Sequence, residues 1–137
     1  VNDVFEKLIG DGKPAFVKRE KTTMKEAIKI IKASGGVSIL AHPARYGNDH
    51  ETIIEHYVTD GGTGIETNYP NDKILGLTKE RSEEFNNHIR QLAKQHDLLH
   101  SGGSDFHDEE RSAIGDGGVT SAELELLRGR AREKKRS

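Results

Sequence analysis

Ser101-Gly102-Gly103-Ser104-Asp105-Phe106-His107 follows the apolar pair Leu98-Leu99 and leads at once into acidic, polar sequence. Its two glycines permit a close or left-handed backbone approach that bulkier residues resist. Two potential metal ligands, Asp105 and His107, come directly after them. If the chain is still extended there, both side chains point to the same side and can share one ion. The stretch therefore predicts a strand that ends in a metal-binding loop.

An earlier stretch has the same layout. Gly35-Gly36 leads into the apolar segment Val37-Ser38-Ile39-Leu40-Ala41, and His42-Pro43 follows that segment. Two apolar segments thus end in ligand-type side chains, which is typical of an active site built at the C-terminal ends of parallel strands. Either motif taken alone is also compatible with a turn that exposes polar residues. The repetition of the layout favours the active site.

Helices and strands are expected to alternate along the rest of the chain. Apolar residues at helical spacing predict an amphipathic piece over 2–9 and a longer helix over about 79–96. Three pairs of residues with the spacing of a capping box mark the starts of further helices. These pairs are Thr23 with Glu26, Asn48 with Glu51, and Thr120 with Glu123. Short apolar segments predict strands at 15–17, 37–41, 64–68 and 98–102.

The order of these elements is a strand followed by a helix, repeated four times. Short βα repeats of this kind imply a parallel sheet with helices outside it. Four strands cannot close a barrel of the usual eight. We therefore expect an α/β fold in which about four βα units form part of a TIM-like barrel, with residues 1–137 as a single domain. The basic tail over 128–137 is expected to be a solvated helix end rather than an RNA-binding arm.

Composition sets loose bounds on the function. The chain has 137 residues and a net charge of -2, and 32% of its residues are hydrophobic, so the core must be lean. This near-neutral charge gives no argument for a nucleic-acid or membrane surface. The sequence contains no cysteine, which excludes a disulfide framework and a thiolate metal site and fits a cytoplasmic protein. No apolar run approaches the roughly 20 residues that a membrane span needs.

Taken together, the motifs resemble a known family. The motifs are Gly-Lys-Pro-Ala-Phe-Val at 12–17, Gly-Gly-Val-Ser-Ile-Leu-Ala-His-Pro-Ala-Arg-Tyr at 35–46, Gly-Ile-Glu at 64–66 and Gly-Ser-Asp-Phe-His at 103–107. In this order they are similar to the C-terminal half of a domain of PHP, the polymerase and histidinol phosphatase superfamily. The similarity is greatest to its stand-alone phosphoesterase branch, which includes nucleoside 3′,5′-bisphosphate phosphatases and 5′→3′ exoribonucleases acting on short RNA.

The resemblance implies a distorted (β/α)7 barrel that holds up to three divalent metal ions. It also implies that His42, Asp105 and His107 are metal ligands and that Asp105 and His107 take part in catalysis. Clustered divalent ions neutralise the charge of a phosphate ester and lower the pKa of a bound water, which gives a metal-activated hydroxide near neutral pH. Imidazole and carboxylate ligands without thiolate suit manganese, zinc or iron.

Part of the family's metal-binding pattern has no counterpart in this sequence. The opening His-x-His motif, the Asp that follows it, and the His and Glu ligands of the early strands are all absent. The resemblance therefore implies that half of the metal cluster lies outside this chain, which begins at Val1 rather than at methionine. We expect the chain alone to be inactive or nearly so. We also expect it to associate with the missing N-terminal half of the barrel, or to oligomerise through an exposed sheet edge.

Several polar side chains are candidates for binding the substrate. Arg45 lies in the loop after the first ligand and can bind phosphate oxygens in a bidentate manner, the alternative being a surface salt bridge. Lys13, in the Gly-Lys-Pro motif, is a weaker candidate. Glu66 and Asn68 lie at a strand end and should face the site, where Asn68 would contact substrate and Glu66 would position a ligand or the substrate. Strand alternation places His100 near Phe106 or inside the barrel.

Four further histidines lie in expected helices or in their caps. We interpret these residues as structural or solvent-exposed; they are His50, His56, His88 and His96.

Three functions are compatible with the sequence. The first is a metal-dependent phosphoesterase that hydrolyses a nucleotide or a short oligoribonucleotide. The second is a phosphatase for a small metabolite such as histidinol phosphate. The third is a non-catalytic, partial PHP module that serves structure or binding. The expected partners are accordingly a phosphorylated small molecule or short RNA together with the missing half of the barrel, and no membrane.

Overall fold

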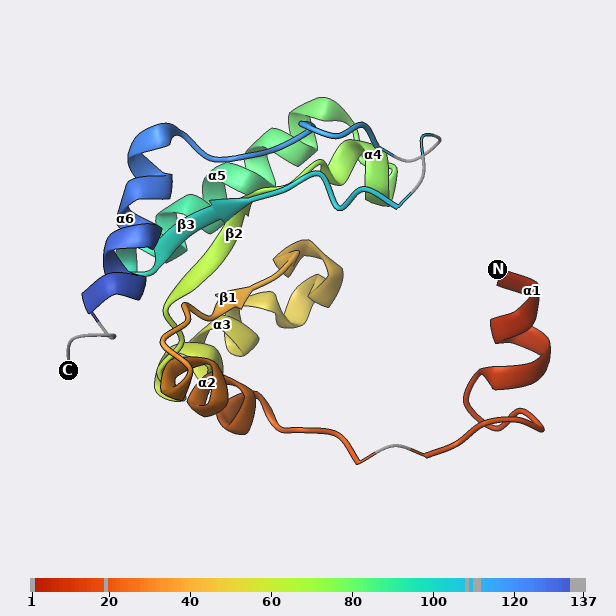
Figure 1. Cartoon of the computed structure of the whole chain (residues 1–137). Helices are drawn as coiled ribbons and strands as arrows, with labels where there is room; N and C mark the ends of the chain where they lie inside the picture. The colour runs from red at the N-terminus through yellow and green to blue at the C-terminus, as the bar shows by residue number, and fades with distance from the viewer. Residues whose placement is uncertain (1, 19, 108, 110–111, 134–137) are drawn as a thin grey trace.

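Three short apolar segments pair as a parallel sheet in the structure, a computed structural model that describes residues 2–18, 20–107, 109 and 112–133 (Figure 1). The strands are β1 (Ile39–Leu40), β2 (Gly64–Asn68) and β3 (Leu99–Gly102). They lie in the order β1-β2-β3, so neighbours in the sequence are neighbours in the sheet. Their carboxyl ends therefore meet at one edge, as the two ligand motifs predicted.

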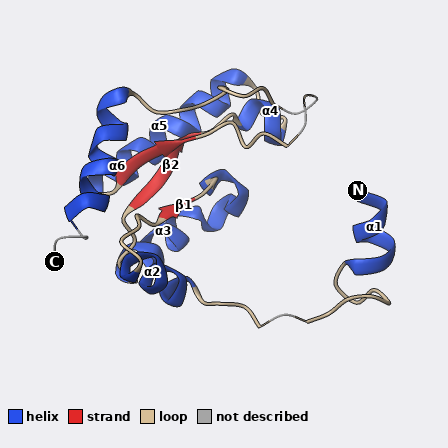
Figure 2. Ribbon diagram, in the orientation of Figure 1, coloured by secondary structure: helices blue, strands red, loops and turns tan. Residues whose placement is uncertain are grey.

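Helices connect the strands and cover the sheet (Figure 2). In chain order the helical elements are α1 (Asn2–Val4), the π-helical η1 (Phe5–Ile9), α2 (Met24–Ala33), the 3-10 helix η2 (Pro43–Asp49), α3 (His50–Thr59), α4 (Asn71–Leu75), α5 (Lys79–Gln95) and α6 (Ser121–Glu133). The connection from β1 to β2 runs through η2 and α3, and the connection from β2 to β3 runs through α4 and α5. Parallel strands need crossovers of this kind. Within the described residues, no helix combines the length and the apolar character that crossing a bilayer requires.

The core lies between the sheet and the helices. Ile65 is fully buried at the centre of β2, where it pairs with Leu40 of β1 and with His100 of β3. Each fully buried side chain of this size contributes about 1.5–3 kcal/mol to stability. The buried cluster consists of Ile28, Leu40, Ile54, Tyr57, Ile65, Ile89, Ala93 and Leu98. Because side chains alternate along a strand, Ile65 and Thr67 face the helices, whereas Glu66 and Asn68 face the opposite side.

Two of the three predicted helix caps are confirmed. The Thr23 hydroxyl accepts the Glu26 amide, and the Glu26 carboxylate accepts the Thr23 amide, which is a complete capping box. Thr120 and Glu123 make the same reciprocal hydrogen bonds before α6. The predicted cap at Asn48 is wrong, because Asn48 lies inside η2. The helix α3 begins at His50, directly after the last residue of η2.

The predicted strand at 15–17 is also wrong. Backbone hydrogen bonds from Ala15 to Leu8 and from Phe16 to Lys13 turn the chain there, and Val17 is 77% exposed. Three apolar residues without a neighbouring strand have no partner for their backbone groups and no surface to cover. The described residues therefore contain three βα units instead of four. They form an open sheet, so the α/β class is confirmed, while the TIM-like (β/α)7 barrel stays a prediction.

The glycine pair at the end of β3, Gly102 and Gly103, permits a close backbone approach. A Cβ atom at Gly102 would lie 2.5 Å from the carbonyl oxygen of Gly118 and 2.8 Å from that of Asn68. Gly117, in the loop before α6, is equally close to the backbone of this glycine pair. A Cβ atom at Gly117 would lie 2.6 Å from the Gly103 carbonyl oxygen. The loop before α6 thus lies directly against the end of β3. This contact fixes where the loop after Gly103 leaves the sheet.

We predict that Gly102→Ala destabilises the protein by about 1–3 kcal/mol, because the added methyl group overpacks a contact made by backbone atoms on both sides. Urea denaturation measures this change. The control is Gly129→Ala in α6, where nothing lies within 4 Å of the added Cβ. That control should stabilise by about 0.5–1 kcal/mol, since alanine favours a helix over glycine. Equal stability of Gly102→Ala and the native chain would contradict the packing described here.

Candidate functional site

The two ligand motifs end their strands with an unusual backbone conformation. His42, two residues after β1, has φ 35°, and Asp105, three residues after β3, has φ 47°. Among the described residues other than glycine, only these two and Asp97 have positive φ. A left-handed conformation of this kind costs of order 1–3 kcal/mol, and such residues cluster at active sites. The chain is thus bent sharply at two of the predicted ligands.

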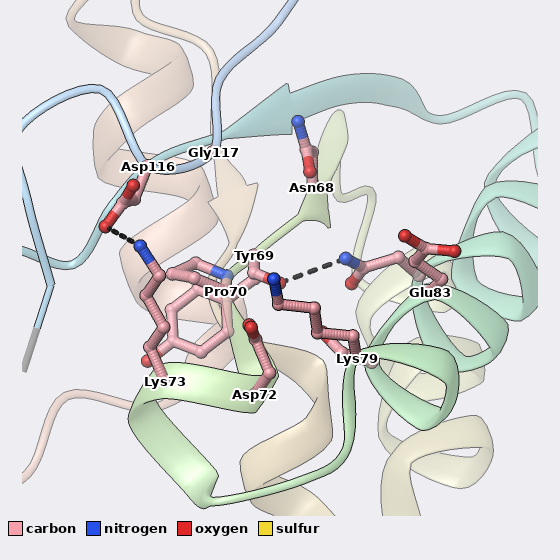
Figure 3. A pocket seen from close by; sticks show the side chains of 11 residues that line it. Asn68, Tyr69, Pro70, Asp72, Lys73, Lys79, Glu83, Asp116 and Gly117 are labelled. Atoms are coloured by element: carbon pink, nitrogen blue, oxygen red, sulfur yellow. Dashed lines mark hydrogen bonds and ion pairs between the residues drawn. The ribbon is translucent and has the colours of Figure 1, made fainter.

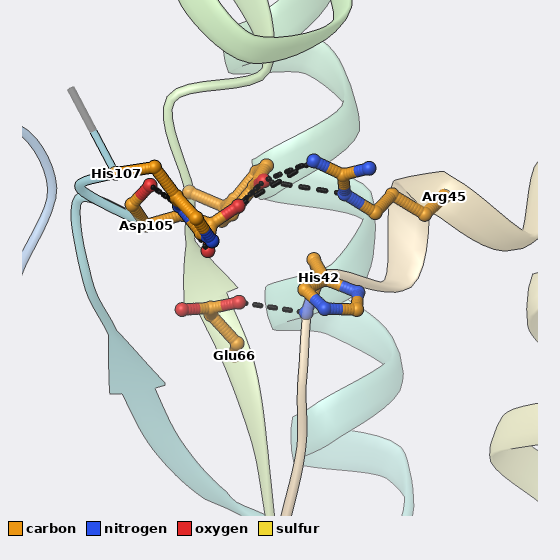
Figure 4. A network of polar contacts seen from close by, with 6 residues as sticks. His42, Arg45, Glu66, Asp105 and His107 are labelled. Carbon is orange, nitrogen blue, oxygen red and sulfur yellow. Dashed lines mark hydrogen bonds and ion pairs between the residues drawn. The ribbon is translucent and has the colours of Figure 1, made fainter. Parts of the chain in front are cut away.

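A polar network joins the ends of all three strands (Figure 4). The Tyr69 hydroxyl, one residue after β2, donates a 2.6 Å hydrogen bond to Oδ2 of Asp105. The Arg45 guanidinium, from the helix after β1, lies 3.5 Å from the same oxygen and 3.4 Å from the Tyr69 hydroxyl. Arg45 is therefore at the site, as predicted, and its alternative role in a salt bridge is also present, with Asp105 as the partner.

The charges of this network are set by its contacts. The hydrogen bond from Tyr69 holds the pKa of Asp105 below its usual value, and the nearby His107 side chain and Arg45 guanidinium act in the same direction. Burial raises the pKa of Tyr69, and its hydrogen bond to Asp105 adds to that rise. Asp105 is therefore an ionised carboxylate at neutral pH, which is the form that binds a metal ion.

His42 has an unpartnered ring nitrogen. Its backbone N–H donates a 2.6 Å hydrogen bond to the Glu66 carboxylate, while its Nδ1 is buried without a hydrogen-bond partner. Burial raises the pKa of Glu66, although the hydrogen bond from His42 opposes this. Glu66 thus lies at the site, as its strand position predicted, and holds the backbone of His42 in place. A buried imidazole nitrogen without a hydrogen-bond partner is an atom that could bind a metal ion.

His107 lies at the exposed edge of the same network. Its Nδ1 donates to the backbone carbonyl of Asp105 at 2.7 Å, and its side chain is 63% exposed. With the proton on Nδ1, the lone pair on Nε2 is free for a ligand. A histidine that donates its second nitrogen to a carbonyl in this way is typical of metal sites.

The three predicted ligands nonetheless do not reach the spacing of one ion. Within the described part of the chain, the group whose three ligand atoms all lie within 4.8 Å of one another is a different one, formed by His50, Glu51 and His88. The binding of one ion by His42, Asp105 and His107 therefore stays a prediction. The sequence interpretation of His50 and His88 did not anticipate that they would meet.

The other candidate residues have different placements. Lys13 is exposed in the segment before α2, which Figure 1 shows set apart from the sheet, so the structure does not bring it to the network. The side-chain amide of Asn68 donates to the Gly118 carbonyl at 2.8 Å and so holds the loop before α6. The prediction that His100 points into the barrel or toward Phe106 is wrong. His100 pairs with Ile65 on the helix side of the sheet, and its Nδ1 lies 3.2 Å from the Thr67 hydroxyl.

Sequence reasoning missed Tyr69, which is only 2% exposed. The available signal was its position, because it follows directly on a strand whose preceding residues were already assigned to the site. Tyr69 also forms part of a pocket of about 240 Å³ (Figure 3). Lys73 and Lys79 line the same pocket, and Lys73 makes a 2.6 Å ion pair with Asp116. Asp72, Glu83 and Asp116 also line this pocket, so the two lysines do not give it a net positive charge.

Comparisons with known proteins find relatives that are named as exoribonucleases and as a bisphosphate phosphatase. No family model matches the chain. It is 38% identical over 106 residues to a 5'-3' exoribonuclease of Haemophilus influenzae, covering 75% of this chain and 35% of that protein. It is 32% identical over 108 residues to the 5'-3' exoribonuclease Rnm of Escherichia coli, covering 77% of this chain and 34% of that protein. It is 34% identical over 119 residues to a 3',5'-nucleoside bisphosphate phosphatase of Chromobacterium violaceum, covering 84% of this chain and 36% of that protein.

A solved structure is similar over nearly the whole chain. It is that of an amidohydrolase from Chromobacterium violaceum with bound sulfate and no metal, with a TM-score of 0.63 and 26% identity, covering 94% of this chain and 44% of that one. The chain spans about a third of the length of the curated relatives it matches. Over most of its own length, the chain is therefore a relative of the exoribonucleases and bisphosphate phosphatases of the PHP superfamily, which confirms the resemblance that its motifs predicted.

Proposed function

We propose that this chain forms the phosphate-binding edge and part of the metal centre of a phosphoesterase that hydrolyses a nucleotide or a short oligoribonucleotide. The observation that carries this proposal is the contact of Arg45, Tyr69 and Asp105 at the carboxyl ends of the strands. The relatives named as exoribonucleases and as a bisphosphate phosphatase support the same substrate class.

The donor atoms at the strand ends suit a divalent metal ion by their chemistry, although their spacing is wider than one ion requires. His42 offers a buried Nδ1 without a hydrogen-bond partner, and Asp105 offers a carboxylate whose pKa is lowered. Two imidazoles and a carboxylate without thiolate suit manganese, zinc or iron. When bound, divalent ions neutralise the charge of a phosphate ester and lower the pKa of a water. His42, Asp105 and His107 are the residues that would hold such an ion.

Arg45 is the residue that would bind the phosphate. It is 42% exposed and shares its guanidinium between Asp105 and Tyr69 at distances of 3.4–3.5 Å, which are long for hydrogen bonds. A phosphate beside Asp105 offers the guanidinium two oxygens in the planar geometry that it binds most strongly. Arg45 can therefore turn to the substrate without leaving an unpaired buried charge.

Tyr69 and Glu66 act as positioning residues. Tyr69 orients the Asp105 carboxylate and lowers its pKa further, while the Glu66 carboxylate accepts a hydrogen bond from the backbone amide of His42. Neither contact uses the atoms of His42 or His107 that would bind a metal ion. These contacts thus leave the two imidazoles available, whereas Oδ2 of Asp105 is shared with Tyr69 and Arg45.

A non-catalytic module is the second candidate function. It is favoured by the spacing of the predicted ligands, which do not meet within 4.8 Å of one another among the described residues. A small-metabolite phosphatase differs from the proposed function only in its substrate, so an assay with several substrates separates all three.

We expect manganese-dependent release of phosphate from a nucleoside 3′,5′-bisphosphate when this chain is joined to the upstream part of the Chromobacterium violaceum phosphatase. The chain alone should release little, because two-metal chemistry needs ions roughly 3.5–4 Å apart and more ligands than three side chains supply. Short 5′-phosphorylated RNA and histidinol phosphate are the comparison substrates. The same fusion with His107→Ala should lose activity. Hydrolysis of histidinol phosphate alone would support the metabolite phosphatase, and no hydrolysis of any substrate would support the non-catalytic module.

In that active protein, Arg45→Ala should lower kcat/KM for the bisphosphate by about 10- to 100-fold, through a higher KM, a lower kcat or both. The reason is that a charge-assisted, bidentate contact contributes about 1.5–3 kcal/mol. The metal content, measured by elemental analysis, should stay unchanged. Arg81→Ala, at an exposed position on α5, is the matched control and should leave the kinetics unaltered. Loss of bound metal in Arg45→Ala would show that Arg45 is structural.

We predict that Tyr69→Phe raises the pKa of Asp105 toward its ordinary value, because the largest cause of the lowered pKa is the Tyr69 hydrogen bond. NMR titration of the Asp105 carboxyl carbon measures this. A lowered carboxyl pKa stabilises the fold above the unfolded pKa, and that contribution is lost as the pH falls through the folded pKa. The variant should therefore lower the free energy of unfolding by about 1–3 kcal/mol at pH 7, and by less below pH ~3.5.

The control for this prediction is Tyr46→Phe, because the Tyr46 hydroxyl has no hydrogen-bond partner among the described residues. An Asp105 titration that is the same in Tyr69→Phe as in the native chain would contradict the proposed role of Tyr69.

A further inference from the structure

A second cluster of ligand side chains lies where α3 begins against α5. His50 and Glu51 are the first two residues of α3, and His88 lies in the middle of α5. The cluster is at the other end of η2 from His42 and shares no residue with the network described above. We propose that His50, Glu51 and His88 form a binding site for a divalent transition-metal ion, best matched by Zn²⁺, that links α3 to α5.

The distances between the ligand atoms are close to those that a bound ion requires. The three atoms lie within 4.8 Å of one another. Oε1 of Glu51 is 2.9 Å from Nε2 of His88 and 4.0 Å from Nε2 of His50. Ligands at about 2.0–2.2 Å around a tetrahedral ion lie roughly 3.3–3.6 Å from each other. The observed values lie on both sides of that range, and the Glu51 side chain, 57% exposed, is free to adjust.

The orientation of His50 is that of a metal ligand. Its Nδ1 lies 2.6 Å from the Gly47 carbonyl oxygen and donates its proton there, so the lone pair is on Nε2. That Nε2 is buried and has no hydrogen-bond partner. An unsatisfied buried polar atom is costly, and an ion between His50 and Glu51 would satisfy it. Donation of the second ring nitrogen to a carbonyl is the usual arrangement around metal-binding histidines.

The backbone supports this orientation. Gly47 has φ 56° and ψ -130° inside η2, a conformation that only glycine adopts readily, and this kink interrupts the helix three residues before His50. The carbonyl of Gly47 is therefore available to the imidazole instead of to a regular helical hydrogen bond. The kink and the histidine orientation depend on each other.

An aromatic side chain holds the two imidazoles near each other. The ring of Phe85 lies 5.1 Å from that of His50 and 6.4 Å from that of His88, and the two histidine rings are 5.4 Å apart. Phe85 is one helical turn before His88 on α5, and Ile89 next to His88 is fully buried, so this part of α5 is firmly packed. The site is therefore largely formed before an ion binds.

The donor set selects the kind of ion. Two imidazole nitrogens and one carboxylate oxygen suit Zn²⁺ and its transition-metal neighbours, whereas Mg²⁺ and Ca²⁺ prefer oxygen ligands alone. His88 and Glu51 are in part exposed, so water can complete a tetrahedral shell. In the absence of the ion, the hydrogen bond between these two side chains takes its place.

The test is a Zn²⁺ titration followed by calorimetry, with Co²⁺ absorption as a second readout. His88→Gln should bind one equivalent of Zn²⁺ fewer than the native chain, or bind that equivalent at least tenfold more weakly. Glu51→Gln should show the same loss, which guards against a folding defect in one variant. His56→Gln, at an exposed position two turns along α3, is the matched control and should bind like the native chain.

His107→Ala separates this site from the predicted strand-end centre and should retain the equivalent that His88→Gln loses. Unchanged Zn²⁺ stoichiometry and affinity in both His88→Gln and Glu51→Gln would overturn the proposal. So would a native chain whose bound Zn²⁺ disappears entirely in His107→Ala.

Discussion

The hydrogen bond from the buried Tyr69 hydroxyl to Asp105 is the contact on which the arrangement of the strand-end site depends. It ties the end of β2 to the loop after β3, and Arg45 adds the segment after β1. Parallel pairing brings three chain segments to one edge, but pairing alone does not orient their side chains. The tyrosine does so from a position that is almost fully buried, where a hydrogen bond to a charged group is strong. The orientation of the Asp105 carboxylate, its lowered pKa and the position of Arg45 therefore depend on one another.

Features that depend on local sequence could be predicted. The predicted strand at 64–68 has its observed bounds, because Gly61-Gly62 before it and Pro70 after it mark its ends in the sequence. The capping boxes at Thr23 and Thr120 formed, because they need only residues three positions apart. The positions of Asp105 and His42 after their strands followed from the same kind of reasoning. Their role as ligands is what the family resemblance implies, and it stays a prediction, because these residues do not lie within 4.8 Å of one another together with His107.

Features that depend on residues far apart in the sequence could not be predicted. Tyr69 and Asp105 are 36 residues apart, and His88 lies 37 residues after Glu51. No local sequence pattern could therefore indicate either contact. His100 was assigned to the wrong side of the sheet, because its direction is decided by its pairing with Ile65 and not by the strand alone. The segment 15–17 is apolar enough for a strand but has no neighbour to pair with. In each case the tertiary partner decides the outcome.

We propose above that the strand ends of this chain hold a divalent metal ion next to an arginine that binds phosphate. Anomalous X-ray diffraction from crystals grown with Mn²⁺ and inorganic phosphate tests it most directly. We expect an anomalous peak beside the Asp105 carboxylate and the Nδ1 atom of His42, with the phosphate against Arg45. A map with no peak at the strand ends, and with Arg45 still paired to Asp105, would contradict this account.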